Sequence, residues 1–229
     1  MDFGKALKFS FFLFSMKKEM QLVKEIKKLK NSKIKKLVDK RLKEFEKTKR
    51  NKKKVFSELC FCLLTANFNA KRAIAMQEKL QEDFLKAKKR QLAKKLKQFG
   101  HRYPNARASY IVEARKKQDE VWNLVKELKQ KKITEQKARE WLVKNIKGLG
   151  YKEASHFLRN LGFFNLAILD FHILDLLEKY GLIKKPKTLT KRKYLEIEEE
   201  LRQVANKVGL KPGILDLYLW FIETGKVLK

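Results

Sequence analysis

Apolar residues recur at helical spacing along nearly the whole chain, and this pattern limits the fold more than any other feature does. A representative stretch places Ile34, Val38 and Phe45 on one helix face, with lysines on the opposite face. Only three prolines and nine glycines interrupt the 229 residues. No stretch alternates apolar and polar residues as a half-buried strand would. The sequence therefore predicts an all-α fold.

The periodicity, together with residues that favour helix ends, predicts a series of helices separated by short turns. Thr134 is suited to cap a helix, because its hydroxyl can accept a hydrogen bond from a free amide of the first turn. Pro212 suits the first turn of the last helix. The predicted helices cover residues 17–30, 33–48, 55–67, 70–86, 89–99, 105–129, 134–146, 151–161, 169–180, 190–208 and 212–224.

The chain carries a large excess of positive charge. Its 57 lysines and arginines, against 26 aspartates and glutamates, give a formal charge of +31. Such a surplus repels itself unless an anionic partner neutralises it, and phosphates bound by these side chains release counterions. Nucleic acid is therefore the favoured partner. An anionic membrane surface, an RNA scaffold and a lysine-biased composition without any partner are the alternatives.

The cysteines and histidines do not indicate a disulfide or a metal site. Cys60 and Cys62 lie two residues apart in an apolar run, on different faces of a helix, so we expect two buried thiols. The three histidines (His101, His156 and His172) are too scattered to indicate zinc. No metal or redox cofactor is predicted.

Residues 1–15 form a short segment that faintly imitates a signal peptide. They contain two lysines followed by an aromatic and apolar stretch. The stretch is too short to span a bilayer, and no small-residue cleavage site follows it. We interpret it as an extension ahead of a single domain at residues 16–229, in a chain expected inside the cell, in the cytoplasm or nucleoid, and not in a membrane.

The segment Gly148-Leu149-Gly150 predicts a tight reversal between two helices. Two glycines around one apolar residue permit positive φ angles, and Leu149 can fill the space between the helices. Backbone amides at the start of the second helix would then point outward and favour an anion such as a DNA phosphate. A plain corner between two helices is an equally good reading of this segment alone.

Two charged residues near the hairpin are candidate catalytic groups. Lys152 lies in the first turn of the second helix, where the helix dipole disfavours a positive charge and so favours the nucleophilic free amine. Asp170 follows four apolar residues at the start of another helix. Taken singly, Lys152 reads as a solvated or phosphate-binding lysine and Asp170 as a helix cap.

The hairpin and the aspartate together resemble a known family. GLGYK at 148–152 followed by LDFH at 169–172 resembles the helix–hairpin–helix and aspartate signature of base-excision DNA glycosylases, in which a lysine here marks members that are also abasic-site lyases. The strings NIKGLGYKEASHFLRNLG, LCFCLLTANFNA and LYLWFIETGKVLK are similar to the type-2 archaeal 8-oxoguanine DNA glycosylases. The resemblance runs from about residue 20 to the end of the chain.

This resemblance implies a two-lobed helical fold, with the hairpin at about residues 140–162 and the active site in the cleft between the lobes. Double-stranded DNA containing an oxidised base would bind there, and the damaged nucleotide would leave the stack. Lys152 would attack the anomeric carbon of the sugar, and Asp170 would stabilise the developing positive charge. The imine would undergo β-elimination on the 3′ side. The family also implies a monomer that needs no cofactor.

The resemblance implies further contacts with the extruded base. Tyr103 and Trp220 would line the base pocket and stack on the purine. Lys229 would reach the pocket and offer its terminal carboxylate to a hydrogen bond that guanine and its oxidised form present differently. Core packing is the alternative for Tyr103 and Trp220, and fraying is the alternative for the terminal residue.

Contacts with the DNA backbone and the orphaned base follow from the same resemblance. Asn67 would enter the duplex beside the orphaned base, with a helix terminus as the alternative reading. Gly148 and Gly150 would bind a phosphate in the hairpin, and His172 would contact another unless it is a buried structural histidine. Phe171 stands where the family commonly has a basic residue, which puts one nearby polar contact in doubt.

Two other functions remain as alternatives. The same fold could excise another oxidised base, such as an oxidised pyrimidine, although enzymes of that preference usually carry a C-terminal four-cysteine cluster that this chain lacks. A non-catalytic helix–hairpin–helix module would explain the charge and the hairpin. It would leave Asp170 and the C-terminal motif unexplained.

Overall fold

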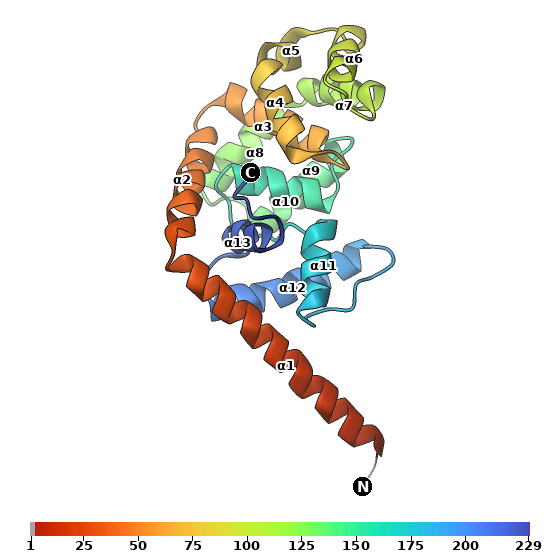
Figure 1. The fold of residues 1–229 in the computed structure, drawn as a ribbon. Helices are drawn as coiled ribbons and strands as arrows, with labels where there is room; N and C mark the ends of the chain where they lie inside the picture. Colours follow the sequence, from red (N-terminus) through yellow and green to blue (C-terminus); the bar gives the residue numbers. More distant parts are fainter. Residues whose placement is uncertain (1–2) are drawn as a thin grey trace. The chain divides into compact units, whose positions relative to one another are not determined.

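The computed structural model describes the backbone of residues 3–229 and the side chains of residues 16–229. Within that range the regular structure is helical and no strand occurs, so the all-α prediction is confirmed (Figure 1). The helices are α1 (Phe3–Lys30), α2 (Lys33–Thr48), α3 (Lys52–Thr65), α4 (Ala70–Lys79), α5 (Gln81–Lys86), α6 (Lys89–Gln98), α7 (Pro104–Lys116), α8 (Gln118–Lys129), α9 (Glu135–Asn145), α10 (Tyr151–Asn160), α11 (Phe171–Lys179), α12 (Lys191–Lys207) and α13 (Pro212–Thr224).

Two of the predicted helices are each broken in the middle. The expected helix 70–86 is interrupted at Leu80, and the expected helix 105–129 is interrupted at Lys117. Both residues have ψ near zero (14° and 7°), which ends one helix and starts the next in a new direction. Neither break has a proline or glycine to mark it, so the periodicity alone missed both.

Helix α1 is longer than predicted. It begins at Phe3 instead of residue 17 and ends at Lys30, and lysines in its last turn complement the negative end of its dipole. The side chains of residues 1–15 lie outside the described part of the chain, so the interpretation of this segment as a separate extension stays a prediction. None of the helices described is long and apolar enough to cross a bilayer.

Contacts between residues divide the chain into two compact units. The first unit comprises residues 1–41 and 167–228, and the second comprises residues 42–166 together with Lys229. In the first unit α13 packs against α1, α11 and α12. In the second unit α3 packs against α4, α5, α7, α8 and α10.

Helix α3 is the core of the second unit. Every residue from Val55 to Thr65 is buried, as expected for a helix that is apolar on all sides. Cys60 and Cys62 lie fully buried on it as free thiols, which confirms their prediction as core residues. Burial raises the pKa of both thiols well above the usual value, so neither is a reactive thiolate. Glu58 is the one charged residue in this buried stretch of α3.

Candidate active site

The predicted hairpin joins α9 to α10. Gly148 has φ of +91°, and a Cβ added to it would lie 2.4 Å from a ring carbon of Tyr110. Both the backbone conformation and the close approach of that ring therefore require glycine. Leu149 is buried between the helices, as predicted. The sequence of the hairpin thus fixes a sharp turn at the start of α10.

One amide at the start of α10, that of Gly150, does not point outward to solvent as the sequence predicts. The amide of Gly150 donates a hydrogen bond to Glu153 Oε2 at 3.2 Å, so a carboxylate of the same helix caps this donor. The sequence predicts instead that this amide points outward toward an anion. A phosphate at this place would meet the amides of the next residues and the positive end of the α10 dipole.

Lys152 lies in the first turn of α10, with its side chain partly buried. His156, one turn further along the same face, is 7% exposed. Burial holds the pKa of this imidazole well below its usual range, and the charges of Arg159, Lys152 and Lys229 act in the same direction. The second unit therefore places a neutral imidazole beside the candidate nucleophile.

The terminal residue Lys229 is held firmly instead of frayed. Its Nζ donates to Glu58 Oε2 at 2.9 Å and to Gln77 Oε1, and lies 4.3 Å from the centroid of the Phe61 ring. The positive charge of Lys229 acts on the buried imidazole of His156. Glu58 and Gln77 were not among the site residues predicted from the sequence. A lone carboxylate in an apolar helix was a signal that could have identified Glu58.

Asn67 lies exposed in the turn between α3 and α4, in a left-handed conformation with φ of +56°. The turn is held from both sides. Arg107 donates to the carbonyl of Ala66 at 2.8 Å, and Nε2 of His101 lies 3.0 Å from the carbonyl oxygen of Leu64. The conformation of Asn67 is thus imposed by buried groups.

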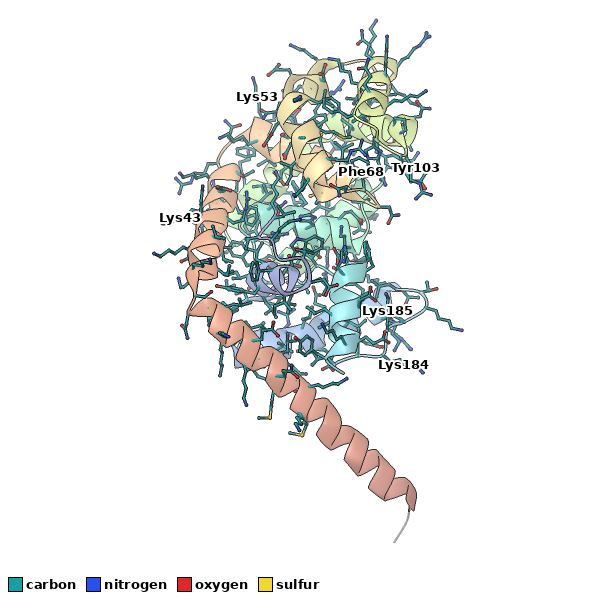
Figure 2. The ribbon with its side chains drawn as sticks, in the orientation of Figure 1. Lys43, Lys53, Phe68, Tyr103, Lys184 and Lys185 are labelled. Atoms are coloured by element: carbon teal, nitrogen blue, oxygen red, sulfur yellow. The ribbon has the colours of Figure 1, made fainter. Side chains whose placement is uncertain are left out.

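Tyr103 is bound to the same histidine. Its amide donates to His101 Nδ1 at 3.0 Å. The ring of Phe68 stacks on that of His101, with their centroids 4.2 Å apart. Phe68 and Tyr103 are labelled in Figure 2. The ring of Tyr103 is 44% exposed, with the guanidinium of Arg102 at 5.2 Å. Tyr103 is therefore not a core residue, and its ring is accessible to a ligand.

Asp170 caps α11 in the first unit. Its Oδ1 accepts a hydrogen bond from the amide of Ile173 at 2.9 Å, so the helix-cap reading is correct as a statement of structure. The segment before it is fixed by α12. The amide of Ala167 donates to Glu198 Oε1 at 2.8 Å, and the hydroxyl of Tyr194 donates to the carbonyl of Ala167 at 2.8 Å.

His172 and Trp220 lie together in the first unit. Their rings meet edge to face, with centroids 5.0 Å apart. Phe171 is 59% exposed, and its ring lies 4.0 Å from that of His172. An exposed aromatic ring thus stands directly beside His172.

The predicted site residues are divided between the two units. The second unit holds the hairpin glycines, Lys152, Lys229, Asn67 and Tyr103, and the first holds Asp170, His172 and Trp220. The pairing of Lys152 with Asp170 and that of Tyr103 with Trp220 stay predictions. Among the described side chains, no group of three or more histidines, cysteines and carboxylates could hold a metal ion.

Comparisons with known proteins cover nearly the whole chain. The family model described as 8-oxoguanine DNA glycosylase matches residues 38–210. The chain is 49% identical to an 8-oxoguanine DNA glycosylase/AP lyase of Methanocaldococcus jannaschii over 92% of this chain and 100% of that one. It is 48% identical to one of Korarchaeum cryptofilum over 91% and 98% of the two chains.

Solved structures agree with these matches. The structure of the Methanocaldococcus jannaschii 8-oxoguanine glycosylase/lyase in complex with a 15mer DNA containing 8-oxoguanine superposes with a TM-score of 0.85 at 48% identity, covering 91% of this chain and 100% of the other. The 8-oxoguanine DNA glycosylase of Thermotoga maritima also gives a TM-score of 0.85, at 44% identity and with 92% and 100% covered.

Proposed function

Because this chain belongs to the 8-oxoguanine DNA glycosylase family, we propose that it excises 8-oxoguanine from double-stranded DNA and then cleaves the strand at the resulting abasic site. One observation carries the proposal. The chain matches glycosylase/AP lyases over nine-tenths of its length and presents Lys152 in the first turn behind the hairpin, where a lyase needs an amine.

The reaction begins with the damaged nucleotide extruded from the duplex, because its sugar is inaccessible inside the stack. The free amine of Lys152 bonds to C1′ while the bond to the base breaks, and Asp170 stabilises the positive charge that develops on the sugar and assists deprotonation of the amine. The sugar ring then opens as the C1′–O4′ bond breaks and O4′ takes up the proton that leaves the lysine nitrogen, which gives the imine. The protonated imine loses a proton from C2′ and expels the 3′ phosphate. Water then hydrolyses the imine and releases the lysine. Apart from the DNA and water, these steps use only side chains of the protein and require no cofactor.

The remaining predicted residues take part in binding. Tyr103, Trp220 and Lys229 contact the extruded base, and Asn67 fills the space beside the orphaned partner. Gly148 and Gly150 form the turn that presents the start of α10 to a DNA phosphate, and His172 contacts the DNA backbone. The exposure of Tyr103 and Asn67 and the constrained conformation of the turn that carries Asn67 support these roles. The enzyme acts as a monomer inside the cell, where its DNA substrate is found.

Borohydride trapping tests the proposal. With a duplex containing 8-oxoguanine opposite cytosine, the protein should become covalently linked to DNA. Lys152→Gln should abolish the adduct while DNA binding persists, and Lys147→Gln, a change in the exposed lysine next to the hairpin, should keep it. Trapping by Lys152→Gln would refute this nucleophile. An adduct only on DNA with an oxidised pyrimidine would favour that lesion, and no adduct on any substrate would favour a purely DNA-binding module.

A further inference from the structure

The ammonium group of the last residue lies in a binding site formed by buried side chains. The side chain of Lys229 is 15% exposed, and that of its partner Glu58 is 6% exposed. A terminal lysine ordinarily has its charge in solvent and its backbone disordered. Here the ammonium lies over the ring of Phe61 and binds a carboxylate and an amide oxygen. The chain end is therefore located by its side chain.

Three helices build this site. Glu58 on α3 also accepts a hydrogen bond from Asn160 on α10 at 2.6 Å and from Gln77 on α4 at 3.1 Å. The Nε2 of Gln77 also lies 3.2 Å from the hydroxyl of Ser57, which leaves its Oε1 directed at Lys229. A buried carboxylate with three donors, one of them a cation, meets the condition under which such a charge is tolerated in a core.

The anchored side chain determines where the terminal carboxylate lies. The charges of Lys229 and Lys152 both act on the buried imidazole of His156, which lies one helical turn from Lys152 on α10. The charges of Lys152 and Lys229 both act on the buried thiol of Cys62, so the two lysines share one neighbourhood of the second unit. Fixing the ammonium therefore fixes a carboxylate near the proposed nucleophile, where the base would be presented.

We propose that Glu58, oriented by Gln77 and Asn160, is a positioning residue for base selection: it binds the Lys229 ammonium and thereby sets the terminal carboxylate against the extruded base. This inference rests on the proposed function, in which the carboxylate of Lys229 contacts 8-oxoguanine. Glu58 touches neither the base nor the sugar. Its effect should appear in excision of the base and not in cleavage at a site that has already lost its base.

Glu58→Gln tests the inference, since it keeps the shape of the side chain and removes its charge. Excision of 8-oxoguanine should fall by about 100-fold, the loss that a misplacement of about 1 Å can cause. Strand cleavage at a preformed abasic site should change by less than about 3-fold, because Lys152 is untouched. Glu135→Gln is the matched control. It alters another buried carboxylate of the second unit, one that binds the amide of Asn165 at 2.8 Å, and should leave both activities intact.

Two further variants separate positioning from general packing. Lys229→Met keeps the terminal carboxylate and an unbranched stem but has no ammonium, so it should lose excision to the same extent as Glu58→Gln. The double variant should be no worse than either single one, because both changes break one interaction. Adding one glycine after Lys229 leaves the ammonium bound but moves the carboxylate, and should also impair excision selectively.

The outcomes distinguish the proposed function from the positioning role of Glu58. If the unchanged protein fails to excise 8-oxoguanine, the proposed function is wrong. If it excises the base and Glu58→Gln does so equally well, the positioning role is wrong. Losses from Glu58→Gln and Lys229→Met that multiply in the double variant would also overturn it. So would an equal loss of abasic-site cleavage.

Discussion

The backbone amide of Tyr103 donates a hydrogen bond to Nδ1 of His101 at 3.0 Å. An amide can only donate, so Nδ1 is the acceptor and the proton of the neutral ring is on Nε2, which lies 3.0 Å from the carbonyl oxygen of Leu64. One neutral imidazole thus joins the turn that carries Asn67 to the start of α7. A second proton on this ring would remove the acceptor that Tyr103 uses.

We expect the stability of the second unit to fall in mild acid. Burial lowers the pKa of His101, and it lowers that of His156 further. Between each lowered pKa and the usual value of 6.5, only the unfolded chain binds the proton. The stabilisation is therefore complete above pH 6.5 and is lost as the pH falls toward the folded-state values.

Urea unfolding at pH 7.5, 6.5 and 5.5 measures this effect. The midpoint should fall on acidification, and His101→Gln should make that fall less steep. His172→Gln leaves both buried histidines in place and serves as the control. A midpoint that did not change from pH 7.5 to 5.5 would show that these imidazoles titrate normally in the folded protein.

Gly148→Ala should destabilise the protein by about 2 kcal/mol or more, because it combines a left-handed backbone with a clash against the Tyr110 ring. Gly225→Ala is the matched control. Gly225 has φ of +69° but open space around the position of a Cβ, so this change carries only the conformational cost of about 1 kcal/mol. Equal unfolding free energies for the two variants would mean that the ring moves aside without cost.

The two roles of Asp170 can be separated by substitution. Asp170→Asn keeps an oxygen that can accept from the amide of Ile173, so stability should change by less than about 0.5 kcal/mol. Excision should nevertheless fall by about 100-fold or more, because an amide cannot stabilise the positive charge on the sugar. Asp170→Ala should lose activity and also about 1 kcal/mol of stability.

Thr190→Ala provides the comparison for Asp170, since Thr190 caps α12 in the same unit through the amide of Lys193. It should lose a similar amount of stability without losing excision. Single-turnover excision and urea unfolding on the same samples give both values. Full activity in Asp170→Asn would show that this residue acts only as a helix cap.

Local signals in the sequence were sufficient for most of the helices and for the hairpin. Apolar spacing identifies α2 and α12, and the pair Gly148 and Gly150 identifies the turn between α9 and α10. The breaks at Leu80 and Lys117 were missed because both residues are compatible with a helix and only their packing turns the chain. Breaks of this kind depend on neighbours distant in sequence.

The candidate site was predictable only where a motif is local. Lys152 and Asp170 lie in strings that resemble a family, and each occupies the helix terminus that the sequence predicted. The binding site for Lys229 was not predictable, because Glu58 receives its hydrogen bonds from residues 19, 102 and 171 positions away. A lone carboxylate in an apolar helix indicates that a partner exists but does not identify it.

At Asn67, the role of the side-chain amide can be tested separately from that of the backbone conformation. Its φ of +56° is tolerated by asparagine and glycine but is costly for alanine. Asn67→Gly should therefore keep the shape of the turn and remove only the amide that would fill the space beside the orphaned base. Asn67→Ala removes the amide and also strains the turn, at a cost of about 1 kcal/mol.

If the amide acts in the duplex, both variants should excise 8-oxoguanine from double-stranded DNA about 10-fold more slowly or worse, since extrusion leaves an unpaired base without a partner. Cleavage of a single-stranded abasic oligonucleotide should be unaffected, because no orphaned base exists there. Single-turnover rates on the two substrates decide the question. Normal duplex activity in Asn67→Gly with a loss only in Asn67→Ala would show that the conformation of the turn matters and the amide does not.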